Sequence, residues 1–165
     1  MNITLIGMSG VGKSLFGEKL AAKLGYRFVD VDLVIEKKQG MKLQKVLDRL
    51  GDSKFIEMEG KTILSLKGEG MVFAPGGSVV YSKGAMEYLK KISKIIYLKD
   101  KPEIIKERTK NLDCRGIVGL KNKTFEALFA EREKLYEKYA DFVVRIDNFN
   151  PEVVVERILQ TIKLS

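Results

Sequence analysis

The chain has 165 residues, 45% of them hydrophobic, and this length predicts a single domain over residues 1–165. It contains no histidine and one cysteine, Cys114, which excludes a histidine general base, a zinc site and an internal disulfide. The net charge is +8, but basic and acidic residues are interleaved without a basic block, so we expect a solvated surface and no nucleic-acid partner.

No apolar run approaches the roughly 18 residues that a membrane-spanning helix needs. The chain begins directly with a predicted strand rather than with a charged leader and an apolar segment. We therefore expect a cytoplasmic monomer with no membrane partner.

An apolar run at residues 3–6 leads into the sequence Gly-Met-Ser-Gly-Val-Gly-Lys-Ser at 7–14, which fits the Walker A pattern of phosphate-binding loops. The glycines let backbone N–H groups wrap a phosphate, and the following helix turns its positive dipole end toward it. We expect Lys13 to be catalytic and to reach the β- and γ-phosphates, and Ser14 to bind magnesium. A glycine-rich turn that fits by chance is disfavoured, because strand, loop and helix follow in the required order. The predicted nucleotide-binding residues here are Gly10, Val11, Gly12, Lys13, Ser14 and Leu15.

Apolar residues at helical spacing after this loop predict a helix that Gly25 ends. Residues 27–32 then predict a short strand that ends in two carboxylates, Asp30 and Asp32. Open α/β sheets bind ligands at the carboxyl ends of their strands. One carboxylate could hold magnesium through water, and the other could accept a hydrogen bond from a substrate hydroxyl. The alternative is that this polar strand end caps a helix at 33–38.

Residues 43–67 predict helix with a break at 51–53. They lie between the second and third strands, and we expect the insertion at 33–67 to form a substrate-binding region.

The third strand, at 71–74, is fully apolar, as in buried parallel sheets, and runs into Gly76 and Gly77. Adjacent glycines at a strand end favour backbone N–H groups close to a ligand, although an ordinary turn explains them equally well. A helix at 85–91 and a fourth strand at 94–98 follow.

Pro102 opens the next helix, as proline prefers the first helical turn, and this helix carries Arg108. The stretch at 111–124 is polar, contains glycine and includes Arg115. Such a stretch is typical of a mobile lid rather than of the core.

Apolar residues around Arg132 predict a helix that bears this arginine on a different face, and a strand at 142–146 and a helix at 153–162 close the chain. Five strands separated by helices, with a phosphate loop after the first, predict the α/β class. We expect a three-layer α/β/α P-loop NTPase fold with a five-stranded parallel sheet, like that of nucleoside-monophosphate kinases, with a lid. The size and the lid are typical of a kinase that acts on a small molecule.

Several of these motifs occur together in one known family, and by them the chain resembles shikimate kinases from end to end. The Walker A sequence is shared with many NTPases, whereas the other motifs are more specific. The matching pieces are the loop at 7–14, Asp-Val-Asp at 30–32, Phe55 with Glu59, Gly76-Gly77, Arg108, Arg115, and Ala-Glu-Arg-Glu-Lys-Leu-Tyr at 130–136.

The resemblance implies transfer of the γ-phosphoryl group of ATP to a hydroxyl of shikimate, a step of aromatic amino acid biosynthesis, with Mg²⁺ as cofactor. It implies that Asp30 assists the metal and that Asp32 binds and orients the attacking hydroxyl as a catalytic residue. Arg132 would pair with the substrate carboxylate, and Glu59, Gly76 and Gly77 would complete the substrate site.

Nucleotide-binding roles follow from the same resemblance. Arg115, also catalytic, would close from the lid over the phosphates. Arg108 would lie near the adenine. Apart from the resemblance, we also expect Phe149 to bind the nucleotide.

The chain departs from the family pattern at three positions. Ile56 stands where an arginine normally grips the substrate carboxylate, Pro75 where the first of three glycines is usual, and Gly116 where proline follows the lid arginine. Either a nearby cation replaces the missing arginine, or the substrate is another small hydroxylated compound. The candidate cations are Arg49, Lys54 and Lys61.

Two classes without kinase activity compete with this interpretation. They are a nucleotide-dependent switch and an RNA-associated P-loop protein. Both would leave Asp32 and Arg132 without a catalytic role.

Overall fold

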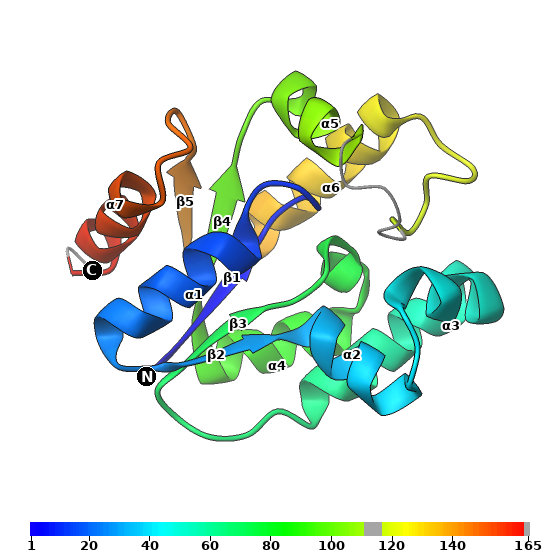
Figure 1. Cartoon of the computed structure of the whole chain (residues 1–165), viewed down its shortest axis with the longest axis horizontal. Helices are drawn as coiled ribbons and strands as arrows, with labels where there is room; N and C mark the ends of the chain where they lie inside the picture. The colour runs from blue at the N-terminus through cyan, green and yellow to red at the C-terminus, as the bar shows by residue number, and fades with distance from the viewer. Residues whose placement is uncertain (111–116, 164–165) are drawn as a thin grey trace.

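The computed structural model describes residues 1–110 and 117–163 (Figure 1). Five strands form one parallel sheet in the order β2-β3-β1-β4-β5. The strands are β1 (Asn2–Ile6), β2 (Arg27–Asp30), β3 (Met71–Ala74), β4 (Ser93–Lys99) and β5 (Phe142–Arg145). The helices are α1 (Lys13–Leu24), α2 (Val31–Gln39), α3 (Leu43–Leu64), the 3₁₀ helix η1 (Gly77–Tyr81), α4 (Lys83–Ile92), α5 (Pro102–Lys110), α6 (Phe125–Tyr139) and α7 (Pro151–Lys163). In this part of the chain no helix combines the length and the apolar content needed to cross a membrane.

Helices cover both faces of the sheet, which explains why the central strands are apolar along their length. All five residues of β1 are buried. Helices α1 and α7 pack together on one face, and α4 and α6 lie on the other (Figure 1). This three-layer arrangement confirms the predicted P-loop kinase fold.

The strand register brings the polar loops to one edge of the sheet. Asp30 pairs with Ala74, and Ile6 pairs with Tyr97. The residues that follow these strand ends, namely the phosphate-binding loop, the start of α2 and the glycine pair, therefore lie side by side.

Strand β2 is two residues shorter than predicted, because Asp30 caps a helix. Its Oδ1 accepts hydrogen bonds from the backbone N–H groups of Asp32 at 3.0 Å and Leu33 at 3.3 Å. Such capping satisfies N–H groups that a helix start leaves unpaired. The prediction that Asp32 belongs to the strand end is therefore wrong: Asp32 lies in the first turn of α2.

The insertion between β2 and β3 consists of α2 and α3, which pack against each other beside β2 (Figure 1). Gly51 interrupts α3 with a φ of 75° and a ψ of 169°, so the predicted break is confirmed. Only glycine adopts this conformation without strain. The kink leaves Leu43, Val46 and Leu47 buried on the first half and Phe55 and Ile63 buried on the second.

Candidate active site

The phosphate-binding loop joins the buried end of β1 to the start of α1. Gly12 caps α1 with a φ of 104°, and a Cβ at this position would lie 2.6 Å from the Phe16 ring. Lys13 Nζ donates to the carbonyl oxygens of Gly7 at 2.8 Å and Met8 at 3.0 Å. The ammonium group is thus held inside the loop, next to the helix N-terminus that attracts anions.

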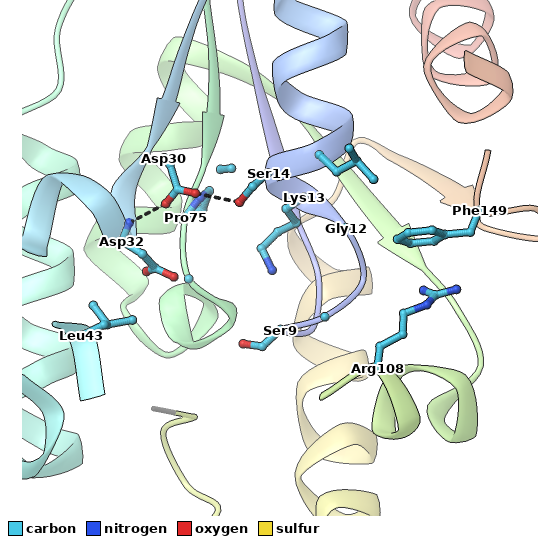
Figure 2. A pocket seen from close by; sticks show the side chains of 14 residues that line it. Ser9, Gly12, Lys13, Ser14, Asp30, Asp32, Leu43, Pro75, Arg108 and Phe149 are labelled. Carbon is cyan, nitrogen blue, oxygen red and sulfur yellow. Dashed lines mark hydrogen bonds between the residues drawn. The ribbon is translucent and has the colours of Figure 1, made fainter. Parts of the chain in front are cut away.

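A cavity of about 460 Å³ opens in front of this loop (Figure 2). Among the residues that line it are Gly10, Gly12, Lys13, Ser14 and Leu15, all predicted to bind the nucleotide. Val11 does not line it: its side chain is fully buried and its N–H donates to Met8 O at 3.2 Å.

One end of the cavity is flat and partly aromatic. The Arg108 guanidinium lies 3.8 Å from the centre of the Phe149 ring, and both side chains line the cavity (Figure 2). Asp100 accepts a hydrogen bond from Arg108 Nη1 at 2.9 Å and so fixes the guanidinium plane. A planar cation on an aromatic ring offers a surface on which a nucleotide base can stack. Sequence reasoning missed Asp100, although it directly follows the buried strand β4.

Ser14 and Asp30 lie next to each other in the wall of the cavity opposite Arg108 and Phe149. Ser14 Oγ donates to Asp30 Oδ2 at 2.7 Å, while Asp30 Oδ1 caps α2 (Figure 2). The two interpretations of Asp30, helix cap and site residue, are therefore compatible, because each uses a different oxygen. A hydroxyl and a carboxylate are the hard oxygen ligands that suit Mg²⁺ when phosphates supply further oxygens.

Asp32 lines the same cavity, and behind it lies a second carboxyl group, Glu59. Glu59 is 1% exposed, and its Oε2 accepts a hydrogen bond from Ser78 Oγ at 2.6 Å. Burial raises the pKa of the Glu59 carboxyl to about 7, and the negative charge of Asp32 adds to the rise. Ser78, Arg132 and the Gly76 N–H favour the charged form less strongly.

Both carboxyl groups lie against the side of Gly76 where another residue would carry its side chain. A Cβ on Gly76 would lie 2.6 Å from Glu59 Oε1 and 3.0 Å from Asp32 Oδ1. We expect Gly76→Ala to lower kcat roughly 10- to 100-fold, because Glu59 Oε1 must move to make room and the neighbouring Asp32 carboxylate must shift as well. Unfolding in urea should show a loss of about 1 to 3 kcal/mol, typical of overpacking.

Gly84→Ala is the matched control for this substitution. Gly84 lies in the first turn of α4, and a Cβ there would meet no atom within 4 Å. This variant should keep wild-type activity and gain about 0.5 to 1 kcal/mol of stability. Wild-type kcat in Gly76→Ala would show that the carboxyl groups do not need their present spacing.

Arg132 is not on a different face of α6, and that prediction is wrong. It is 1% exposed and shares its side of the helix with the buried residues Leu128 and Tyr136, four positions away in each direction. Its Nη2 donates to Val118 O at 2.7 Å, and its Nε donates to Tyr81 Oη at 3.4 Å. Arg132 does not line the cavity.

Gly77 is adjacent to Arg132. A Cβ on Gly77 would lie 2.9 Å from Arg132 Nη1 and 3.2 Å from Tyr136 Oη. The glycine pair thus lets the backbone pass between the carboxyl groups and the buried arginine. Sequence reasoning missed Ser78 and Tyr81, which hold these charged groups, because polar residues after a glycine pair occur in many surface turns.

The described part of the predicted lid, residues 117–124, is attached to α3. Gly119 N donates to Asp52 Oδ2 at 3.0 Å, and Lys121 Nζ lies 3.2 Å from Asp48 Oδ1. Val118 is 5% exposed, so the expectation that the whole stretch lies outside the core is wrong for this residue. Arg115, Cys114 and Gly116 lie outside the described residues.

Ile56 is half-buried and packs against the hydrophobic core. Lys61 forms an exposed ion pair with Glu57 at 2.6 Å, and Lys54 and Arg49 are exposed. None of these three cations lines the cavity. Among residues 1–110 and 117–163, Arg132 is the cation whose charge reaches Glu59.

A phosphate-binding loop that faces a carboxylate across an open cavity is the arrangement with which P-loop kinases bring a triphosphate to an acceptor. The fold and the site define this class of enzyme, a phosphotransferase for small molecules. The family model for shikimate kinase matches residues 9–163, and the chain belongs to that family.

Individual relatives agree over nearly the whole length. The chain is 38% identical to shikimate kinase of Thermodesulfovibrio yellowstonii, with 96% of this chain and 93% of the relative covered. It is 35% identical to shikimate kinase of Sulfurihydrogenibium, with 98% of each covered. Among solved structures, shikimate kinase from Acinetobacter baumannii in complex with shikimate has a TM-score of 0.88 and 27% identity, with 98% of this chain and 92% of that chain covered.

Proposed function

We propose that this chain transfers the γ-phosphoryl group of ATP to a hydroxyl of shikimate. The observation that carries the proposal is one cavity, in a chain of the shikimate kinase family, that joins the phosphate-binding loop to Asp32. The similar Acinetobacter baumannii enzyme was solved with shikimate, which supports this acceptor.

The protein's own groups divide the work between two sides of the cavity. On the nucleotide side, the loop N–H groups and Lys13 bind the phosphates and stabilise charge that develops on the transferring group. Arg108 and Phe149 stack on the base. On the acceptor side, Asp32 accepts a hydrogen bond from the attacking hydroxyl and takes its proton.

Ser14 and Asp30 are the residues that would hold Mg²⁺, because their oxygens already meet beside the loop. Bound there, the ion would neutralise phosphate charge and orient the triphosphate. Arg115 belongs to the part of the predicted lid outside the described residues, and we assign it closure over the phosphates.

Arg132 is proposed to pair with the substrate carboxylate. Two of its nitrogens are engaged by Val118 and Tyr81, and the third, Nη1, lies nearest to Gly77. Because position 56 in α3 is an isoleucine, the carboxylate has one arginine partner where the family pattern provides two. We therefore expect a high KM for shikimate and a smaller effect on kcat. An arginine that binds the carboxylate equally well in the ground state and in the transition state changes KM when it is lost, but not kcat.

A coupled kinase assay tests the function directly. ATP turnover is measured with shikimate, other cyclic hydroxy acids, neutral polyols and nucleoside monophosphates. Shikimate should accelerate turnover most. Turnover that no acceptor changes would support a switch or an RNA-associated protein, and activity on a neutral polyol alone would contradict shikimate as the substrate.

Ile56→Arg should lower the KM for shikimate by one to two orders of magnitude. A bidentate arginine–carboxylate contact contributes roughly 2 to 3 kcal/mol, which corresponds to about 30- to 150-fold in affinity. Steady-state kinetics at saturating ATP measure the change, and Ile56→Met is the control for altered packing. A wild-type KM in the low micromolar range would show that another group already replaces the arginine.

A further inference from the structure

Glu59 is a buried carboxyl group with only one of its two oxygens satisfied. Oε2 accepts the Ser78 hydroxyl at 2.6 Å, whereas Oε1, also buried, has no hydrogen-bond partner among residues 1–110 and 117–163. The Gly76 N–H lies near this carboxyl group but makes no hydrogen bond of normal geometry with Oε1. A buried carboxylate oxygen without a donor is costly, whereas a protonated oxygen can itself donate.

The position of Oε1 shows where such a proton would point. Glu59 Oε1 and Asp32 Oδ1 both lie within 3.0 Å of the point that a Gly76 Cβ would occupy. The two carboxyl groups, from α3 and α2, therefore converge on the same side of Gly76, in the space that a side chain there would fill. Two carboxylates in such a place repel each other when both are ionised, and one shared proton removes the repulsion.

We propose that Glu59 works as a neutral carboxylic acid whose Oε1–H donates to Asp32 and holds the Asp32 carboxylate toward the acceptor hydroxyl. Because Ser78 donates to Oε2, the proton belongs on Oε1. Glu59 is in this sense a positioning residue, since it acts through Asp32. The inference rests on the proposed role of Asp32 in phosphoryl transfer.

The charges around Glu59 determine the expected pH dependence. Asp32 faces Glu59 from α2, and Arg132 faces it from α6. Tyr136, also on α6, is close enough for the charge of Glu59 to raise the pKa of the tyrosine. The Ser78 hydroxyl and the Gly76 N–H approach Glu59 from the η1 side. Burial and Asp32 outweigh the other groups, and the pKa of Glu59 rises to about 7. Below this pH Glu59 can donate to Asp32; above it Glu59 is a second negative charge that repels Asp32.

The first test compares pH profiles of kcat/KM for wild type and Glu59→Gln. Glutamine keeps the shape, carries no charge and offers N–H donors at every pH. Wild-type kcat/KM should fall above a pH of about 7. The decline should approach about tenfold for each pH unit, which is the slope expected when one group loses its proton. Glu59→Gln should lie within about tenfold of wild type at pH 6.5 and lack this alkaline decline, whereas Glu59→Ala should lose activity at all pH values.

The opposite result would overturn the proposal. If Glu59 acts as a carboxylate, Glu59→Gln is impaired throughout, and wild-type activity does not decline as pH rises through 7. Glu57→Gln, a change of an exposed glutamate two residues away, should leave the profile unchanged and serves as the matched control.

A second readout needs no acceptor. Because the pKa of Glu59 is raised from 4.5 to about 7 on folding, the folded protein binds an extra proton between these pH values. The Glu59 contribution to the free energy of unfolding therefore falls as pH rises through this window and is constant above it. As pH rises from 4.5 to about 7, the urea midpoint of Glu59→Gln should therefore increase relative to that of wild type.

A ¹³C NMR titration of the Glu59 carboxyl in wild type covers the case in which Glu59→Gln does not fold. A midpoint near 7 supports the proposal, and a midpoint near 4.5 overturns it. If shikimate is not phosphorylated, the proposed function fails, while the titration and the unfolding experiment still decide whether Glu59 carries the proton.

Discussion

Lys13→Met should lower kcat for phosphoryl transfer by about 100- to 1,000-fold, the loss typical when one transition-state charge partner is removed. In the free protein the ammonium group donates to Gly7 O and Met8 O, on the inner side of the loop. It is therefore placed before ATP arrives, and little reorganisation is needed when charge develops on the transferring group. Methionine has a similar length but neither a charge nor a donor, so the phosphates lose this contact.

Single-turnover kinetics with saturating ATP measure this effect on the transfer step. Circular dichroism and a urea titration check that the fold is intact, since methionine also removes the hydrogen bonds from Lys13 to Gly7 O and Met8 O. Lys19→Met, on the same helix but in an exposed ion pair with Glu152, is the matched control and should retain wild-type kcat. If Lys13→Met keeps more than about a tenth of wild-type kcat, the assignment of Lys13 as a catalytic residue is wrong.

Asp32→Asn should lower kcat by about 100- to 10,000-fold, the range expected when a general base is removed. Asparagine preserves the size and the hydrogen bond from the attacking hydroxyl, but it cannot take the proton. The KM for ATP should change little, because Asp32 lies on the acceptor side of the cavity.

Asp30→Asn is the comparison variant that distinguishes the role of Asp30 from that of Asp32. Asparagine can still cap α2 through its carbonyl oxygen, so the fold should survive. The charge next to Ser14 is lost, and the variant should need more magnesium for half-maximal rate. Magnesium titrations of both variants decide the matter: if both shift only the magnesium requirement, Asp32 is not the residue that binds the acceptor.

Much of the site could be predicted because it is encoded locally. The Walker A loop, the strands around it and the helices are defined by glycine positions and by apolar spacing within short segments. The break at Gly51 and the helix start at Pro102 have equally local causes, namely the backbone preferences of glycine and proline. The motifs along the chain were sufficient to indicate the family, which the comparisons confirmed.

One error occurred where two local preferences compete, and another where a tertiary contact overrides the local pattern. At residues 27–32 the strand pattern continues to Asp32, yet the capping hydrogen bonds of Asp30 begin the helix two residues earlier. The second error concerns Arg132, which the apolar spacing of α6 places on a face of its own, although arginine can be buried when its donors are satisfied. It is buried here because Val118 O and Tyr81 Oη, which come from distant parts of the chain, satisfy its donors.

The amino-acid sequence by itself determined the class of this protein and the position of the phosphate-binding loop, since these depend on neighbours along the chain, and it predicted Asp30 and Asp32 as site residues. Only the tertiary structure decided the environment of Glu59. Its burial, the bond from Ser78 and the approach of Asp32 bring together α2, α3 and the turn after β3. The proton affinity of a carboxyl group depends on solvent access and on charges in space, and neither quantity can be derived from residue order.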